Sequence, residues 1–276
     1  MSTNIAQEKT KRELKTKISD LRSYRVVKAN ALIQKTRYSL SAQAQKCVLY
    51  IISKIRPDDS ELKELDFSIV EFCQVCGLDK SNGANYRYIK QTLKELRDKS
   101  FWMELETGTE TTVAWIDKIT ISEKSGVVKL KIDDTLKPYL LHLQEKFTQY
   151  ELVYTLAMKS QYSIRLYELL KSYEWKSGFE INIDELKKML LAEKYDRFPD
   201  FKRYVLDIAL REIATYTDIS VTYEIKKLGR RYDSLLFYVK TKSDLTERLL
   251  TWENLNQNLT PEEKQKKAAA AAGKEP

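Results

Sequence analysis

Few residues of this chain have the types and spacing that chemistry at an active site needs. The sequence has one histidine, His142, so a Ser-His-Asp or Cys-His catalytic centre would have to use that residue. A single histidine also excludes the paired-histidine metal sites of single-strand nickases. Its surroundings, KPYLLHLQEK, favour a structural role. The sequence contains no GxxxxGKS/T motif and therefore no phosphate-cradling nucleotide loop.

The cysteines and paired acids suggest core and cap positions more than a metal centre. Cys73 and Cys76 form a CxxC, but a zinc site needs four ligands and only Cys47 and His142 remain to complete it. Their surroundings, IVEFCQVCGL, predict an amphipathic helix with core thiols, and the odd cysteine count favours reduced thiols. The pair Asp133–Asp134 comes nearest to a two-metal nuclease pattern, and a helix cap is the simpler interpretation. We therefore expect a binding protein without metal or cofactor, not an enzyme.

The positive charge is concentrated in two regions. The formal net charge is +8; residues 1–28 carry a surplus of five Lys and Arg, and residues 201–242 carry a surplus of four, which leaves −1 for the remainder. A nearly neutral body with two basic regions indicates a polyanionic partner. Surplus lysine that only aids solubility is the alternative explanation for the N-terminal region. No apolar run approaches the length of a membrane span, and residues 1–20 lack the apolar centre of a secretory signal, so we expect a cytoplasmic protein.

The second basic region predicts a helix followed by a β-hairpin. FKRYVLDIALREIATYT has apolar residues at helical spacing, and DISVTYEIKK and YDSLLFYVKTK alternate as strands around Gly229. On a helical wheel Leu206, Ala209, Leu210 and Ile213 share one side, and Arg203, Asp207 and Arg211 lie on the other, beside Tyr204. Four cations cluster at the hairpin tip: Lys226, Lys227, Arg230 and Arg231. A half-buried helix with a cationic outer face beside a basic hairpin is how a winged helix holds duplex DNA, with the helix in the major groove and the hairpin on phosphates.

The first half of the chain predicts a similar series of elements. The patterns predict helices over 41–56, 69–76 and 86–99, the last with Arg87, Lys90, Gln91 and Lys94 on its outer face. Strand patterns follow in FWMELET, TTVAWIDKITISEK and GVVKLKID. In the second half, helices are expected over 163–175 and within FEINIDELKKML, and KYDRFPD is expected to be a linker.

The two halves match each other in apolar spacing. FSIVEFCQV at 67–75 aligns with INIDELKKM at 181–189 at an offset of 114, and LKEL at 93–96 aligns with LREI at 210–213 at an offset of 117. This predicts a duplicated unit with three extra residues between the helices of the second copy. We expect a basic N-terminal arm over 1–25, domains over 26–146 and 147–245, and a largely disordered tail over 246–276 that contains a helix near 249–259.

The segment YVLDIALREIATYTDISVTYEIKKLGRRYDSLLFYV resembles the iteron-binding plasmid replication initiators, a family with tandem winged-helix domains. The helix SIRLYELLK at 163–171 and the stretch NALIQKTRYSLSAQAQKCVLYIISKI are similar to that family too. The resemblance covers about residues 26–242 and predicts an α+β, mostly helical fold of two tandem winged-helix domains.

The resemblance implies binding to repeated double-stranded DNA sites at a plasmid origin, strand opening and recruitment of host replication proteins. Many members of that family also form a homodimer through the first domain and repress their own gene. The DNA-contacting positions that it implies here are Lys202, Arg203, Asp207, Arg211, Lys226, Lys227, Arg230 and Arg231, with Arg87, Lys90, Gln91 and Lys94 in the first domain.

Three other functions remain open from the sequence. A winged-helix transcriptional repressor would share every DNA-binding feature. A protein-interaction module is disfavoured because its surface should be less cationic. A DNA-processing enzyme lacks a site.

Overall fold

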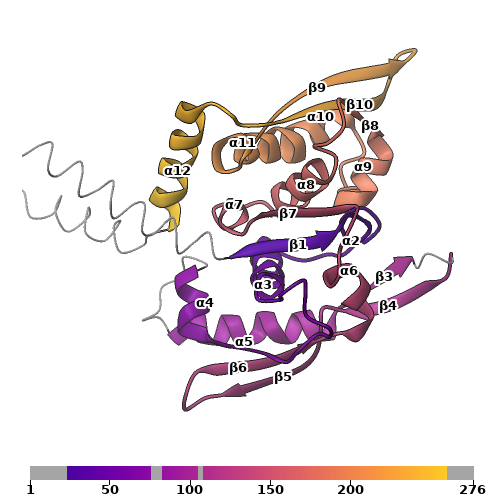
Figure 1. Ribbon diagram of the computed structural model, residues 1–276. Coiled ribbons are helices and arrows are strands. Elements are labelled where there is room, and N and C mark those ends of the chain that lie inside the picture. Colours follow the sequence, from indigo (N-terminus) through magenta and orange to yellow (C-terminus); the bar gives the residue numbers. More distant parts are fainter. Residues whose placement is uncertain (1–23, 76–82, 105–107, 260–276) are drawn as a thin grey trace, which may run out of the picture.

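Three helices and a three-stranded antiparallel sheet occur in the same order twice along this chain (Figure 1). The structure is a computed structural model, and it describes residues 24–75, 83–104 and 108–259. We call the two repeats the first unit and the second unit.

The first unit occupies the lower half of Figure 1 and has six elements shared with the second. They are α3 (Ala42–Ser53), β2 (Leu65–Ser68), α4 (Ile69–Val75), α5 (Gly83–Asp98), β5 (Ile116–Ser122) and β6 (Val127–Ile132). A separate hairpin, β3 (Ser100–Glu104) and β4 (Glu110–Ala114), is inserted between α5 and β5. The sequence pattern TTVAWIDKITISEK therefore covers two strands of different sheets, which meet at Trp115.

The second unit repeats the order with a longer hairpin. Its elements are α8 (Gln161–Ser172), β8 (Phe179–Asn182), α9 (Ile183–Leu190), a third helix built from α10 (Phe198–Phe201), the π-helical turn η2 (Lys202–Leu206) and α11 (Asp207–Tyr216), then β9 (Ile219–Leu228) and β10 (Arg231–Thr241). The third helix begins at Phe198, so the expectation that KYDRFPD is a linker was wrong over its last residues. Pro199 in the first helical turn needs no N–H partner there, which favours helix initiation at this point.

The two units have the same sheet topology and the same helix start. The strand orders are β2-β6-β5 and β8-β10-β9, antiparallel throughout. In the first unit the Ser68 hydroxyl accepts a hydrogen bond from the Glu71 N–H at 3.0 Å. In the second, the Asn182 side chain accepts one from the Asp184 N–H at 2.9 Å. These N-caps begin α4 and α9 at aligned positions, so residues 114 apart in the sequence are structurally equivalent at this point. With the same sheet topology, both units are winged helices.

The sequence suggested that the three extra residues of the second unit all lie between its helices. In the structure only some of them do. α4 and α9 begin 114 residues apart, and the third helices begin at Gly83 and Phe198, which are 115 apart. Two of the extra residues therefore lie inside the third helix before the aligned leucines at 93 and 210. The wider turn of η2 takes up one of them, because a π-helical turn has an i→i+5 repeat.

Several short elements join the units. They are β1 (Arg25–Ala29), α2 (Asn30–Gln34), the 3-10 turn η1 (Asp134–Leu136), α6 (Lys137–Leu140), β7 (Phe147–Glu151), α7 (Val153–Leu156) and the C-terminal helix α12 (Leu245–Leu259). β1 pairs antiparallel with β7 from Arg25 opposite Glu151 to Ala29 opposite Phe147. This small sheet lies between the two units in Figure 1.

One continuous hydrophobic core extends through both units. It includes Leu49 and Phe72 of the first unit and Leu166, Phe201 and Phe237 of the second, each with an exposed fraction of 2% or less. A large apolar interface disfavours independent motion of the two units.

The ends of the chain correspond in part to the expectations. The predicted arm over 1–25 lies outside the described residues up to position 23, and Arg25 already belongs to β1. The tail expected from 246 is helical to Leu259, where Leu255 packs against Val153 and Ala157. Residues 260–276 lie outside the described part of the chain.

Candidate nucleic-acid interface

The third helix of the second unit has one buried side and one polar side. Phe201, Val205, Leu206, Ala209 and Ile213 are all fully buried. Phe201 and Leu206 are five residues apart, and η2 keeps both on the inner side because its turn is wider than that of an α-helix. A regular helical wheel therefore predicts the inner side correctly from 206 onward. It misses the buried residues Phe201 and Val205 before that point.

The outer side of this helix presents the charged residues that the sequence predicted. Arg203, Asp207 and Arg211 are exposed, and Lys202 is half-exposed. Neither Arg203 nor Arg211 has an ion-pair partner among the residues that the structure describes. Two guanidinium groups with open donors on one helix face fit guanine O6 and N7 or phosphate oxygens.

Tyr204 is a surface residue that the predicted set of contacts leaves out. It is 45% exposed and stacks on Tyr195, with ring centroids 5.8 Å apart and an interplanar angle of 21°. The Arg203 guanidinium lies 5.3 Å from the Tyr204 ring centroid. The wheel placed Tyr204 beside the arginines, but its stack on a residue of the preceding loop had no sequence signal.

Lys202 and Asp207 form an exposed ion pair on the same face. The Lys202 Nζ lies 2.7 Å from the Asp207 Oδ1 and 2.9 Å from its Oδ2. The hydrogen bond to Asp207 raises the pKa of Lys202 above its usual range, and Tyr223 of β9 adds to the shift. The pair therefore offers DNA less net charge than two separate groups, although a carboxylate here has the chemistry to accept from a cytosine amino group.

The hairpin β9–β10 forms a long wing with a two-residue turn. Leu228 pairs with Arg231, so Gly229 and Arg230 make the turn, as predicted. Gly229 has φ +64°, and a glycine at the first central position suits a two-residue hairpin turn of type II′. Figure 1 shows this wing extending past the body of the second unit.

Two of the four wing cations are tied back to the body of the second unit. Lys226 Nζ lies 2.5 Å from the Glu180 Oε2, and Arg231 Nη2 lies 2.6 Å from the Asp184 Oδ2. Lys227 lies over the Tyr232 ring at 4.8 Å. Within the described part of the chain, Lys227 and Arg230 have no carboxylate partner. These two cations are therefore the most available for phosphates.

The start of the third helix lies beside the start of β10, close to the turn of the wing. The Phe198 and Tyr232 ring centroids are 4.6 Å apart, which brings α10 against the first residues of β10. The structure therefore places the cationic helix face and the basic wing on neighbouring elements of one unit. This arrangement suits a helix in the major groove with a hairpin on the adjacent backbone.

The equivalent surface of the first unit is largely neutralised by its own acids. Arg87, Lys90, Gln91 and Lys94 are all exposed on α5, as the wheel predicted. Lys90 Nζ lies 3.0 Å from the Glu123 Oε1 at the β5–β6 turn, and Lys94 pairs with Asp98. The Glu123 side chain raises the pKa of Lys90. The first unit therefore offers one arginine, Arg87, with no ion-pair partner in the described residues, together with Gln91.

The residues that resembled catalytic or metal groups have structural roles. The Asp133 side chain accepts from the Thr135 N–H at 2.9 Å and caps η1, as expected. His142 is exposed in a left-handed backbone conformation, and its N–H donates to the Pro57 carbonyl at 2.8 Å. Cys47 and Cys73 are buried, and burial raises the pKa of Cys47 to about 12. Cys76 lies outside the described residues, so the role of the CxxC stays a prediction.

Two features are absent from the described part of the chain. Within them, no group of three or more His, Cys, Asp or Glu side chains is placed to hold a metal ion. Across the described ranges, no helix is long and apolar enough to cross a membrane.

Two family models match the chain in sequence. Residues 25–171 match the model described as "Initiator Replication protein, WH1", and residues 182–239 match "Initiator Rep protein, WH2". The first match alone covers more than half of the chain.

Curated proteins and a solved structure match as well. A replication initiation protein of Escherichia coli is 27% identical over 227 residues, which cover 78% of this chain and 69% of that protein. The PI protein of Escherichia coli is 36% identical over 141 residues, which cover 44% of this chain and 46% of that protein. The crystal structure of Pi initiator protein in complex with iteron DNA matches with a TM-score of 0.68 at 25% identity, covering 81% of this chain and 99% of that chain.

Proposed function

Since this chain belongs to the family of initiator replication proteins, which are non-catalytic DNA-binding proteins, we propose that it starts replication of a plasmid by binding iterons, repeated double-stranded sites at the origin. The observation that carries the proposal is the match to an initiator bound to iteron DNA, because it covers more of the chain than either unit alone. Both winged-helix units therefore take part in the match.

In this proposal the second unit makes the dominant contact. Its third helix enters the major groove, where Arg203 and Arg211 meet base edges or flanking phosphates and the Lys202–Asp207 pair lies beside them. Lys227 and Arg230 grip phosphates from the wing, and Lys226 and Arg231 join them by exchanging Glu180 and Asp184 for phosphate oxygens. The first unit adds a weaker contact through Arg87, Lys90, Gln91 and Lys94.

The later steps of initiation belong to the same proposal. Binding to several repeats promotes opening of the origin and brings host replication proteins to it in the cytoplasm. A homodimer formed through the first unit represses the gene of the protein. These steps rest on the family membership, and no residue is assigned to them.

We also place the boundary between the two domains at residues 146 and 147. Support comes from α8, which packs against α9, α11 and β10 of the second unit, although it also packs against α2 and α3 and the first family match extends through it to residue 171. Amide hydrogen exchange tests this boundary: residues 161–172 should share the protection of β8–β10, and protection like that of β2 and β6 would move the boundary.

The binding part of the proposal is tested with the purified full chain and duplex DNA from the region that flanks its gene. We expect tight binding to duplexes with direct repeats about two helical turns apart. Affinity for a shuffled duplex should be lower by roughly a thousandfold or more, and both affinities should fall steeply with salt. Equal binding to repeat and shuffled duplexes at every salt concentration would contradict sequence-specific recognition.

Initiation is tested separately by deleting the gene from its plasmid and supplying the protein from a second replicon. Replication should stop on deletion and return when the protein is supplied. A plasmid that continues to replicate without the gene, while the protein still binds a short palindrome beside it, would show a transcriptional repressor instead.

A further inference from the structure

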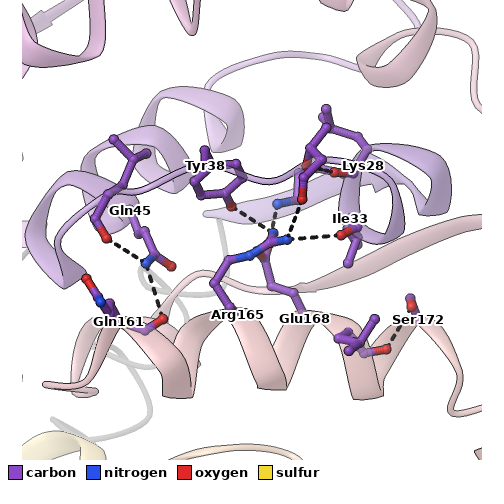
Figure 2. A network of polar contacts seen from close by, with 12 residues as sticks. Lys28, Ile33, Tyr38, Gln45, Gln161, Arg165, Glu168 and Ser172 are labelled. Atoms are coloured by element: carbon purple, nitrogen blue, oxygen red, sulfur yellow. Dashed lines mark hydrogen bonds and ion pairs between the residues drawn. The ribbon is translucent and has the colours of Figure 1, made fainter. Parts of the chain in front are cut away.

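The contact between the two units contains a buried ionic cluster. Lys28 of β1 and Glu168 of α8 form an ion pair with exposed side-chain fractions of 1% and 0%. Arg165, 7% exposed, lies on the same helix with its Nη1 3.8 Å from the Glu168 Oε2. Figure 2 shows these three side chains meeting between the strand and loop of the first half of the chain and the helix α8.

Arg165 of the second unit donates three hydrogen bonds to the segment that leads into α3 of the first unit. Its Nη2 donates to the carbonyl of Ile33 at 3.2 Å and of Thr36 at 3.0 Å, and its Nη1 donates to the Tyr38 hydroxyl at 2.9 Å. The guanidinium also lies 4.4 Å from the Tyr38 ring centroid. One side chain of the second unit thus satisfies two backbone carbonyls and one hydroxyl of the segment that leads into α3.

Two further hydrogen bonds join the first half of the chain to the two ends of α8. The Gln45 Nε2 of α3 donates to the Gln161 carbonyl at 3.2 Å, and the Gln34 Nε2 donates to the Ser172 Oγ at 3.0 Å. Both appear with the cluster in Figure 2, at the two ends of the helix. The whole length of α8 is therefore held to the first half of the chain by directional bonds.

Burial is the largest cause of the pKa shifts at three residues of this contact. Burial raises the pKa of Tyr150 well above its ordinary value, and Glu168 adds to the shift, so Tyr150 donates its hydroxyl proton to the Glu168 Oε1 at 2.5 Å. Burial also raises the pKa of Tyr38 to about 12. Burial lowers the pKa of Lys28, against the opposite effect of Glu168. The cluster therefore holds strongly desolvated groups whose polar partners are one another and the backbone carbonyls of Ile33 and Thr36.

A buried ionic network adds little net stability, because desolvation of its charges offsets their attraction, but it is selective for one geometry. Rotation of one unit relative to the other would leave Lys28, Arg165 or Glu168 buried without a partner.

We propose that the network of Lys28, Arg165 and Glu168 sets the distance and angle between the DNA-binding faces of the two units, so that the protein accepts one spacing between the two halves of each repeat. The three residues are positioning residues for DNA recognition and do not touch DNA. The inference rests on the proposed binding of repeated DNA by both units.

The physical basis is effective concentration. When two binding modules are held rigidly, the second contact follows the first at high effective concentration, but only if the DNA presents its second half at the matching position. A looser connection lowers the effective concentration at the native spacing and tolerates altered spacings. Spacing tolerance therefore reports on the connection between the units, whereas general destabilisation of the fold does not change it.

Hydroxyl-radical footprinting first locates the two halves of one repeat that the protein protects. The affinity of the full chain is then measured for that repeat and for duplexes with one to five base pairs inserted between the two halves. For the natural chain, an insertion of five base pairs should weaken binding by roughly a hundredfold or more, because it turns the second half to the opposite side of the duplex. For Lys28→Met, which leaves Glu168 paired with Arg165 and Tyr150, the same insertion should cost at most about a tenth of that factor.

The matched control is Lys171→Met, which removes a mostly buried lysine of the same helix. Lys171 pairs with Asp218 at 2.7 Å and with Glu174 at 2.6 Å inside the second unit and does not cross to the first. Its spacing profile should equal that of the natural chain. Tyr38→Phe is a milder second variant, which loses one hydrogen bond from Arg165 and keeps the ring contact, and it should relax the profile less than Lys28→Met.

The outcomes separate the two levels of the proposal. If Lys28→Met and Tyr38→Phe both keep the natural spacing profile, the network does not set the spacing. The same conclusion follows if Lys171→Met relaxes it equally. If the natural chain shows no preference for repeat DNA over shuffled DNA, the proposed function itself fails.

Discussion

The two units have the same topology, but they differ in which of their surface cations are paired with carboxylates of the same unit. In the first, Lys90 of the third helix is neutralised by Glu123 of its own wing, so helix and wing cancel each other. In the second, the wing cations Lys226 and Arg231 pair with acids of β8 and α9, and the wing tip keeps Lys227 and Arg230. The wing of the second unit is also longer, with strands of 10 and 11 residues against 7 and 6.

The difference shows that shared topology does not imply an equal distribution of available surface charge. Cations that the unit's own carboxylates leave unpaired are the most available to phosphates. On the proposed function, we therefore expect the second unit to be the principal DNA binder and the first to make the weaker contact. The following predictions test this asymmetry, from the largest expected effect to the smallest.

The largest effects are expected in the core, where the two units should behave alike. Phe201→Ala in the second unit and Phe72→Ala in the first should each lower the free energy of unfolding by about 3–5 kcal/mol, because both rings are fully buried. Since the core is continuous, each variant should still unfold in one transition. Urea unfolding followed by circular dichroism and by tryptophan fluorescence checks this. Two separated transitions would show that the units are independently stable.

Arg203 should read sequence more strongly than its counterpart in the first unit. Arg203→Ala should reduce discrimination between the cognate site and single-base variants by about 1–3 kcal/mol, because a bidentate contact to a base edge is lost. Arg87→Ala should change the same quantity less. Binding measured over a panel of mutated sites gives the comparison, with Arg248→Ala on α12 as an exposed arginine outside both faces. An Arg203→Ala variant with an unchanged preference would remove that residue from base reading.

The wing of the second unit should act on all sequences equally. Arg230→Ala with Arg231→Ala should weaken binding to cognate and shuffled duplexes alike and reduce the slope of log affinity against log salt by about one for each lost phosphate contact. Lys124→Ala, an exposed cation at the turn of the first wing, should alter the slope less. Binding titrations at four or more salt concentrations measure it. Identical slopes for the double variant and the natural chain would show that this wing does not contact phosphates.

The smallest effect is expected from freeing a cation in the first unit. Glu123→Gln removes the partner of Lys90 and one negative charge near the DNA, so affinity should rise a few-fold and the salt slope should steepen by less than about one. Glu145→Gln, an exposed carboxylate in the loop before β7, is the matched control. Lower DNA affinity for Glu123→Gln would mean that the ion pair holds α5 in its binding position instead of neutralising the charge of Lys90.

Much of the fold followed from periodicity, because the side that a helix or strand buries depends on neighbouring residues of the chain. The helices predicted over 41–56 and 86–99 are confirmed as α3 and α5, within a few residues at their ends. The repeat was visible in the apolar spacing, and the caps at Ser68 and Asn182 show that the aligned segments begin equivalent helices. The π-helical turn was missed, since a wheel assumes one constant period.

The outward direction of the predicted surface residues also followed from the sequence. All four α5 positions and the wing cations are exposed where the patterns placed them. Their contact with DNA stays a prediction. The patterns did not show that Lys226 of the wing is paired, because its partner Glu180 lies 46 residues away along the chain.

The sequence by itself determined the order of the elements, their buried sides, the turn at Gly229 and the family, because these depend on local spacing and residue type. Only the tertiary structure decided how the available charge is divided between the units and how the units are joined. In the sequence Lys28 is one more cation of the basic region 1–28, yet it is buried against Glu168, 140 residues later, and only packing of the whole chain brings them together. Electrostatic effects depend on distance in space and on exclusion of water, and local sequence patterns encode neither across such separations.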